Sequence, residues 1–128
     1  MKVRAVYRQE VLVADSDESL IDVAGRMQFE EVGSLAIIEH GRLVGIITER
    51  DLARALSDGV DPVETPVADY MTAEPVTVSP DTEASAAAAA MLDLGVRHLP
   101  VMEEGRVVGM VSSRDLLSIE AWSATGVM

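Results

Sequence analysis

Residues 45–52 read GIITERDL, and residues 109–116 repeat the pattern as GMVSSRDL. In both copies, a short apolar run typical of a buried strand ends in a hydroxyl residue and passes directly into a polar, helix-like stretch. The glycine, arginine and aspartate of the two copies lie 64 residues apart, and Met27 and Met91 keep the same spacing. A constant offset across two strands and two helices indicates that the chain consists of two copies of one unit.

The turn between strand and helix carries a hydroxyl and, three residues later, a carboxylate. These are Thr48 and Asp51 in the first copy, and Ser112 and Asp115 in the second. One interpretation is a capping box, in which the hydroxyl residue caps the helix and the carboxylate reaches back to the cap. The other is a pair of polar groups that face a ligand at the mouth of a cleft. The residues alone leave both interpretations open, and one turn can satisfy both.

The composition favours a folded domain without catalytic or metal chemistry. The chain has 128 residues, of which 48% are hydrophobic and only 3% aromatic, so its core is expected to consist of aliphatic residues and methionine. Cysteine is absent, which excludes disulfides, thiol catalysis and thiolate metal sites. Two histidines argue against a histidine metal cluster, and no nucleophile–base pair or Walker-type phosphate loop is evident. We therefore expect no enzyme activity and no metal site.

The charge opposes two classes of partner. A formal net charge of -12 has the wrong sign for broad contact with nucleic-acid phosphates or anionic lipid. No apolar window of about 18 residues is present, and the first residues lack the hydrophobic stretch of a secretory signal. The sequence therefore predicts a soluble cytoplasmic protein that binds neither nucleic acid nor membrane.

Periodicity and turn residues predict the same element order in each copy. In the first copy we expect a strand at 11–13, a helix at 17–31, a strand at 35–38, a turn at 39–42, a strand at 43–47 and a helix at 49–58. In the second we expect a strand at 76–78, a helix at 81–94 begun by Ser79 and Pro80, a strand at 99–102, a turn at 103–106, a strand at 107–111 and a helix at 113–121.

These elements predict an α+β fold of two halves, each with a small three-stranded sheet and two helices. The expected division is a first repeat at 1–58, a linker rich in proline and polar residues at 59–67, and a second repeat at 68–128. Each half is too small to bury both faces of its sheet alone. The halves are therefore expected to pack about a pseudo-twofold axis, with clefts between them at the strand ends.

Several motifs in fixed order resemble a known family. They are YMT at 70–72 ahead of the strand expected at 76–78, GVRHLPV at 95–101, and the two Gly-x-x-hydroxyl-x-x-Asp turns. Together they resemble a pair of cystathionine-beta-synthase (CBS) domains, also called a Bateman module, over residues 6–121. The resemblance implies β-α-β-β-α repeats and a regulatory module that binds an adenosine-containing ligand in the cleft between them.

The resemblance also implies the ligands and partners. AMP, ADP or ATP is the expected regulatory ligand, with S-adenosylmethionine or NAD as alternatives, and no cofactor is expected to be obligatory. A homodimer is implied, acting on a regulated protein that the sequence does not identify. The alternative from a different class is a dimerisation or protein-interaction module whose clefts are empty.

Carried over residue by residue, the resemblance assigns the two turn aspartates to ribose hydroxyls and the two hydroxyl residues to ribose or phosphate. The residues just before the second strand of each repeat would face phosphate, and an apolar slot near the first strand would hold adenine. The candidate ligand-binding residues are Thr48, Asp51, Ser112, Asp115, Arg97, His98, Arg114 and Arg50, with Val11, Val13, Val76 and Val78 as the candidate adenine slot.

The two copies depart unequally from the family pattern. The first has Tyr7-Arg8 at the positions of Met71-Thr72, and its phosphate-facing pair is the uncharged Gly33-Ser34. The second has Arg97-His98 at the equivalent positions. We therefore expect the second site to be the better phosphate binder, and the occupied one if only one site is filled.

Overall fold

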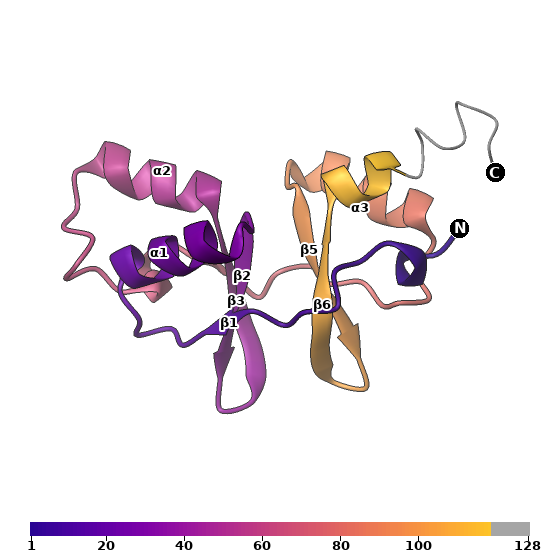
Figure 1. Cartoon of the computed structure of the whole chain (residues 1–128), viewed down its shortest axis with the longest axis horizontal. Helices are drawn as coiled ribbons and strands as arrows, with labels where there is room; N and C mark the ends of the chain where they lie inside the picture. The colour runs from indigo at the N-terminus through magenta and orange to yellow at the C-terminus, as the bar shows by residue number, and fades with distance from the viewer. Residues whose placement is uncertain (119–128) are drawn as a thin grey trace. The chain divides into compact units, whose positions relative to one another are not determined.

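The computed structural model describes residues 1–118, which form two compact units (Figure 1). One unit is Leu12–Pro75, and the other joins Met1–Val11 to the chain from Val76 onward. Both mix helices with small sheets, so the expected α+β class is confirmed. The predicted end of the last helix lies outside the described residues.

The unit Leu12–Pro75 is built on a four-stranded sheet in the order β1-β2-β3-β4. β1 runs parallel to β2, and the other two pairings are antiparallel. Two α-helices and a 3-10 helix complete the unit. The bounds are β1 Val13–Ala14, α1 Leu20–Glu30, β2 Ser34–Glu39, β3 Arg42–Thr48, α2 Glu49–Asp58, η2 Val67–Asp69 and β4 Thr72–Ala73.

The other unit repeats this plan with less regular strands at its edges. Its hairpin of β5 and β6 is flanked by two isolated bridges, a parallel one between Val78 and Val101 and an antiparallel one between Arg8 and Met110. These bridges stand where β1 and β4 stand in the first sheet. The bounds are η1 Val3–Ala5, α3 Ala84–Leu94, β5 His98–Glu103 and β6 Arg106–Ser112, and residues 113–118 are helical.

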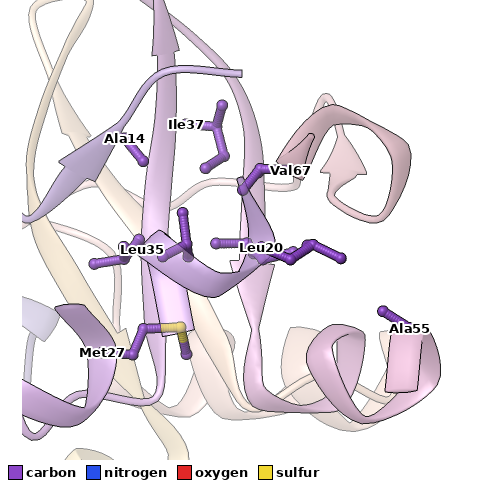
Figure 2. Close-up of a cluster of buried hydrophobic side chains, with 9 residues drawn as sticks. Ala14, Leu20, Met27, Leu35, Ile37, Ala55 and Val67 are labelled. Carbon is purple, nitrogen blue, oxygen red and sulfur yellow. The ribbon is translucent and has the colours of Figure 1, made fainter. Parts of the chain in front are cut away.

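Each unit has its own aliphatic core. In the unit Leu12–Pro75, helix α1 buries Leu20, Val23 and Met27, whose spacing places them on one helical face against residues of β2 and β3. Figure 2 shows Leu20, Met27, Leu35 and Ile37 of this cluster. Met91 is buried at the equivalent place on α3. The full clusters are Ala14, Leu20, Val23, Met27, Leu35, Ile37, Ile47, Ala55 and Val67 in one unit, and Val3, Ala87, Met91, Leu99, Val101, Val111 and Leu116 in the other.

The 64-residue offset extends to segments that the sequence prediction left undefined. η1 and η2 lie 64 residues apart, and their first residues, Val3 and Val67, are both fully buried. The backbone N–H of Val67 donates to Glu18 O, and that of Val3 donates to Thr82 O, each at 2.8 Å. Each unit therefore takes up a segment that precedes the other repeat in sequence.

This exchange makes the compact units differ from the linear division at 1–58, 59–67 and 68–128. Residues 1–11 pack with the hairpin of the second repeat, and residues 67–75 pack with the sheet of the first. Backbone hydrogen bonds are the physical reason, because the carbonyls of residues 16, 18, 80 and 82 accept from the exchanged segments.

Two helices begin later than predicted, because the carbonyls ahead of them accept these hydrogen bonds from the exchanged segments. The helix expected from residue 17 begins at Leu20, and the one expected from residue 81 begins at Ala84. Ser79 and Pro80 therefore precede α3 instead of starting it, and the Ser79 hydroxyl accepts from Asp81 N in a turn. The strand expected at 76–78 is reduced to the bridge at Val78, and that expected at 11–13 lies at Val13–Ala14. Helix α2 has the predicted bounds.

Candidate functional site

The first of the two repeated turns is a capping box at the start of α2. Thr48 N donates to Asp51 Oδ2 at 2.9 Å, and Asp51 N donates to Thr48 Oγ1 at 3.4 Å. The Thr48 hydroxyl also donates to Asp51 Oδ2 at 3.0 Å. These bonds satisfy backbone donors that a helix start leaves unpaired, and they hold Asp51 in a buried position, 5% exposed.

The second turn has the same reciprocal bonds. Ser112 N donates to Asp115 Oδ2 at 2.9 Å, and Asp115 N donates to Ser112 Oγ at 3.2 Å. The capping interpretation of the doubled motif is therefore correct in both repeats. Because each cap uses only one carboxylate oxygen, it leaves Oδ1 of each aspartate for another contact.

The two remaining carboxylate oxygens differ in their surroundings. Asp51 Oδ1 lies 3.7 Å from Arg54 Nη2, a charge contact that is too long for a hydrogen bond. Asp115 is half-buried, and within residues 1–118 its Oδ1 has neither an ion pair nor a hydrogen bond. We call Oδ1, the oxygen that the cap does not use, the outer oxygen. The outer oxygen of Asp115 is therefore a more available acceptor than that of Asp51.

The residues expected to face phosphate lie directly opposite the turns. Strand register pairs Ser34 with Thr48, and His98 with Ser112. Backbone bonds fix the same neighbourhood, since Glu49 N donates to Gly33 O at 3.2 Å and Ser113 N donates to Arg97 O at 2.9 Å. The structure thus brings the predicted polar residues of each repeat together within one unit.

The charges around the two turns are unequal. Beside the second turn, Arg97 and Arg114 are exposed and His98 is half-buried. At the first turn the equivalents of Arg97 and His98 are Gly33 and Ser34, and Ser34 is buried; Arg50 is exposed. Positions 97 and 98 of the second repeat are therefore basic, where the equivalent residues of the first repeat are uncharged.

The predicted adenine slot falls on the first strand of each repeat. Val13 lies in β1 and Val78 at the bridge to Val101, while Val11 and Val76 are exposed. The strand pairings show that Ala14 and Val78 are the equivalent positions, because Ala14 pairs with Ile37 and Val78 with Val101. The four valines are therefore not matched pairs: Leu12 and Ala14 correspond to Val76 and Val78.

Sequence reasoning missed Arg54. This arginine lies one turn beyond Asp51 on α2, and its guanidinium donates to Tyr70 O at 2.9 Å and stacks over the Tyr70 ring. The Tyr70 hydroxyl donates to Asp58 at 2.7 Å, and this bond raises the pKa of Tyr70. The i,i+3 spacing of Asp51 and Arg54 was the available signal.

The described part of the chain has neither a metal-binding cluster nor a membrane-spanning helix. Residues 1–118 contain no group of three or more histidine, aspartate or glutamate side chains that could hold a metal ion. No helix in this range is long and apolar enough to cross a bilayer.

Comparison with known proteins gives matches over most of the chain. The CBS domain model matches residues 3–58 and 67–121. The uncharacterized protein MK0525 of Methanopyrus kandleri is 34% identical over 95% of this chain, and an uncharacterized 17.7 kDa protein of Acidianus ambivalens is 38% identical over 90% of it. The chain spans 64% of the length of the first relative and 70% of the second.

A solved structure is similar in both fold and extent. The CBS domain pair of protein MJ0100, in complex with 5′-methylthioadenosine and S-adenosyl-L-methionine, has a TM-score of 0.88 and 27% identity to this chain. The match covers 96% of this chain and 98% of that one.

Proposed function

We propose, because the chain belongs to the CBS domain family, that it is a regulatory module that binds an adenosine-containing ligand at its capped turns. AMP, ADP or ATP is the proposed ligand class. The module needs no obligatory cofactor and carries out no catalysis. Ligand occupancy changes its association with itself or with a regulated protein.

One observation carries the proposal: Asp115 caps its helix through Oδ2 and presents an Oδ1 without a partner in residues 1–118, beside Arg97 and His98. A carboxylate oxygen accepts hydrogen bonds from neighbouring ribose hydroxyls, and a guanidinium matches phosphate. The cap fixes the position of the carboxylate before the ligand arrives, which lowers the ordering cost of binding.

The hydrogen bonds expected between the Asp115 carboxylate and the ribose account for a large share of the binding free energy at micromolar affinity. Two hydrogen bonds to a charged group contribute about 1.5–3 kcal/mol each. Micromolar binding corresponds to about 8 kcal/mol in total. Loss of the Asp115 charge is therefore expected to weaken binding strongly.

We propose an adenosyl ligand because both ligands of the similar MJ0100 domain pair contain adenosine. The MJ0100 pair binds 5′-methylthioadenosine and S-adenosyl-L-methionine, whose common part is adenosine. The cations beside the second turn favour a phosphorylated adenosine there. S-adenosylmethionine and NAD remain the alternatives that the binding experiment distinguishes.

The test is titration calorimetry with AMP, ADP, ATP, S-adenosylmethionine and NAD on three proteins. Asp115→Asn keeps an oxygen for the cap and removes the charge, so we expect its affinity to fall by about tenfold or more. Asp51→Asn makes the same change at the first turn and is the matched control, with a smaller expected effect. Equal affinity in the wild type and Asp115→Asn would reject the assignment of Asp115.

A module that only dimerises is the second candidate, and exposed apolar side chains on the helices favour it. Phe29, Leu56 and Leu92 are large and strongly exposed on α1, α2 and α3. We propose a homodimer in either case. A stable dimer by light scattering, together with no binding of any of the five compounds, would select this candidate over the ligand-binding one.

A further inference from the structure

Arg54 lies beside the outer oxygen of Asp51 and makes three contacts in this position. Its Nη2 lies 3.7 Å from Asp51 Oδ1 and donates to Tyr70 O at 2.9 Å. Its guanidinium carbon lies 5.3 Å from the centroid of the Tyr70 ring, a cation–π distance. The backbone of Tyr70 is itself held in place, because its N–H donates to Val67 O.

The second repeat lacks this arrangement. The position 64 residues after Arg54 is Ser118, whose hydroxyl donates to the backbone oxygen of Asp115 at 2.7 Å. Within residues 1–118, no cation lies within ion-pair distance of the Asp115 carboxylate. The two turns thus have the same cap, but the side chain at the position three residues after the aspartate is Arg54 in one and Ser118 in the other.

The burial of Asp51 makes this difference matter. The Asp51 side chain is 7% exposed and that of Arg54 is 55% exposed, so water screens this pair mainly from the arginine side. A ribose hydroxyl that donated to Oδ1 would approach the same oxygen that the guanidinium faces at 3.7 Å, and a ligand that needed this space would displace Arg54. That displacement also loses the hydrogen bond and the ring contact with Tyr70.

We propose that Arg54 is a built-in competitor for the ligand at the first turn, so that the first repeat accepts an adenosyl ligand only when Arg54 leaves Asp51. This inference rests on the proposed function and deepens it by assigning a regulatory contact to one of the two sites. The first site is closed by the chain's own guanidinium, and the second is open.

A phosphate contact is the opposite role for Arg54, and the two roles change ligand affinity in opposite directions. A competitor weakens binding of any ligand that needs Asp51, including one without phosphate. A phosphate contact strengthens binding of phosphorylated ligands only. A probe that has ribose hydroxyls and no phosphate therefore isolates the competition, and 5′-methylthioadenosine is such a compound.

The experiment uses full-length protein carrying Asp115→Asn, which weakens the second site so that the first is measured. Arg54→Ser introduces the residue type of the second repeat, and Arg54→Gln keeps an amide donor for the Tyr70 carbonyl. Calorimetry with 5′-methylthioadenosine should show binding about tenfold or more tighter in both variants than in their Asp115→Asn parent. Adding Asp51→Asn should remove the gain.

Arg42→Ser is the control for charge, because it removes an exposed arginine from β3 of the same unit and should leave the affinity unchanged. Unchanged or weaker binding in Arg54→Gln, with an unaltered melting temperature, would overturn the competitor. If Asp115→Asn weakens binding and neither Arg54 variant restores it, only the competitor fails. No binding to the wild type or to any variant rejects the proposed function as well.

Discussion

Gly45 and Gly109 lie within β3 and β6 at the point where the exchanged segments pair with these strands. A Cβ atom built on Gly109 would lie 2.6 Å from Tyr7 Cδ2 and would collide with the Arg8 carbonyl oxygen. One built on Gly45 would lie 2.5 Å from Met71 Sδ and 3.0 Å from Thr72 O. The glycine of each doubled motif thus admits the neighbouring segment, while the aspartate six residues later forms the cap.

We predict that Gly109→Ala destabilises the protein by about 1–3 kcal/mol, because the new methyl group overpacks against backbone that cannot yield without losing its pairing. Gly45→Ala should cost less, since the flexible Met71 side chain can move. Gly25→Ala is the control: nothing lies within 4 Å of its Cβ position in α1, so it should stabilise by about 1 kcal/mol. Thermal unfolding measures all three, and equal melting temperatures for Gly109→Ala and wild type would contradict the prediction.

The 3-10 helices η1 and η2 occupy equivalent places in the two units but differ in their side-chain contacts. Arg4 in η1 donates to Asp81 at 2.8 Å. This hydrogen bond, and then the charge of Arg4, lower the pKa of Asp81. The equivalent residues near η2 are Ala68 and Asp17. Because alanine carries no charge, Ala68 cannot form the ion pair that Arg4 forms with Asp81. The side-chain tie is therefore specific to the N-terminal segment.

The lowered pKa gives a pH dependence with a definite sign. A carboxyl whose folded pKa lies below its unfolded value of 3.8 contributes stability above that value and loses it as the pH falls through the folded pKa. We expect Asp81→Asn to be less stable than wild type at pH 7, with the difference disappearing in acid below pH 3.8. The contribution is small because both side chains are exposed.

Asp17→Asn is the matched control, since it removes the equivalent charge from a carboxylate that has no ion pair within residues 1–118. Denaturant unfolding across pH measures the difference. A gap between wild type and Asp81→Asn that stays constant from pH 7 into acid would show that the Arg4–Asp81 pair does not carry it.

The sequence predicted most elements because their signals are local. The bounds of α2 follow from its cap at Thr48 and from Gly59, which takes a left-handed backbone conformation after the helix. The starts of α1 and α3 could not be predicted in this way. Acidic residues and proline ahead of them resemble helix starts, yet the carbonyls of Glu18 and Thr82 are used by segments distant in sequence.

At the scale of the whole molecule, the repeat alone could not reveal the segment exchange. A 64-residue offset is unchanged whether residues 1–11 pack with the first repeat or with the second, because the equivalent segment makes the reciprocal choice. The pairings of Arg8 with Met110 and of Thr72 with Ile46 decide it. The linear repeats are therefore units of sequence, and the compact units combine parts of both.

The placement of the candidate residues was predicted as far as local motifs allow. The turns, their aspartates and the neighbouring Arg97-His98 come together within their units as expected from the β-hairpin register. The Arg54 contact was missed because it depends on Tyr70, which reaches α2 from beyond the linker. The two turns therefore differ in two ways: the Arg97-His98 pair is visible in the sequence, and the Arg54 contact is visible only in the fold.

The most direct test of ligand binding at unequal turns is a crystal structure of the full chain grown with AMP. We predict AMP at the second turn, with its ribose hydroxyls about 3 Å from Asp115 Oδ1 and its phosphate beside Arg97. The first turn should keep the contact between Asp51 and Arg54. AMP bound away from Asp115, or bound equally at both turns with Arg54 undisturbed, would contradict this.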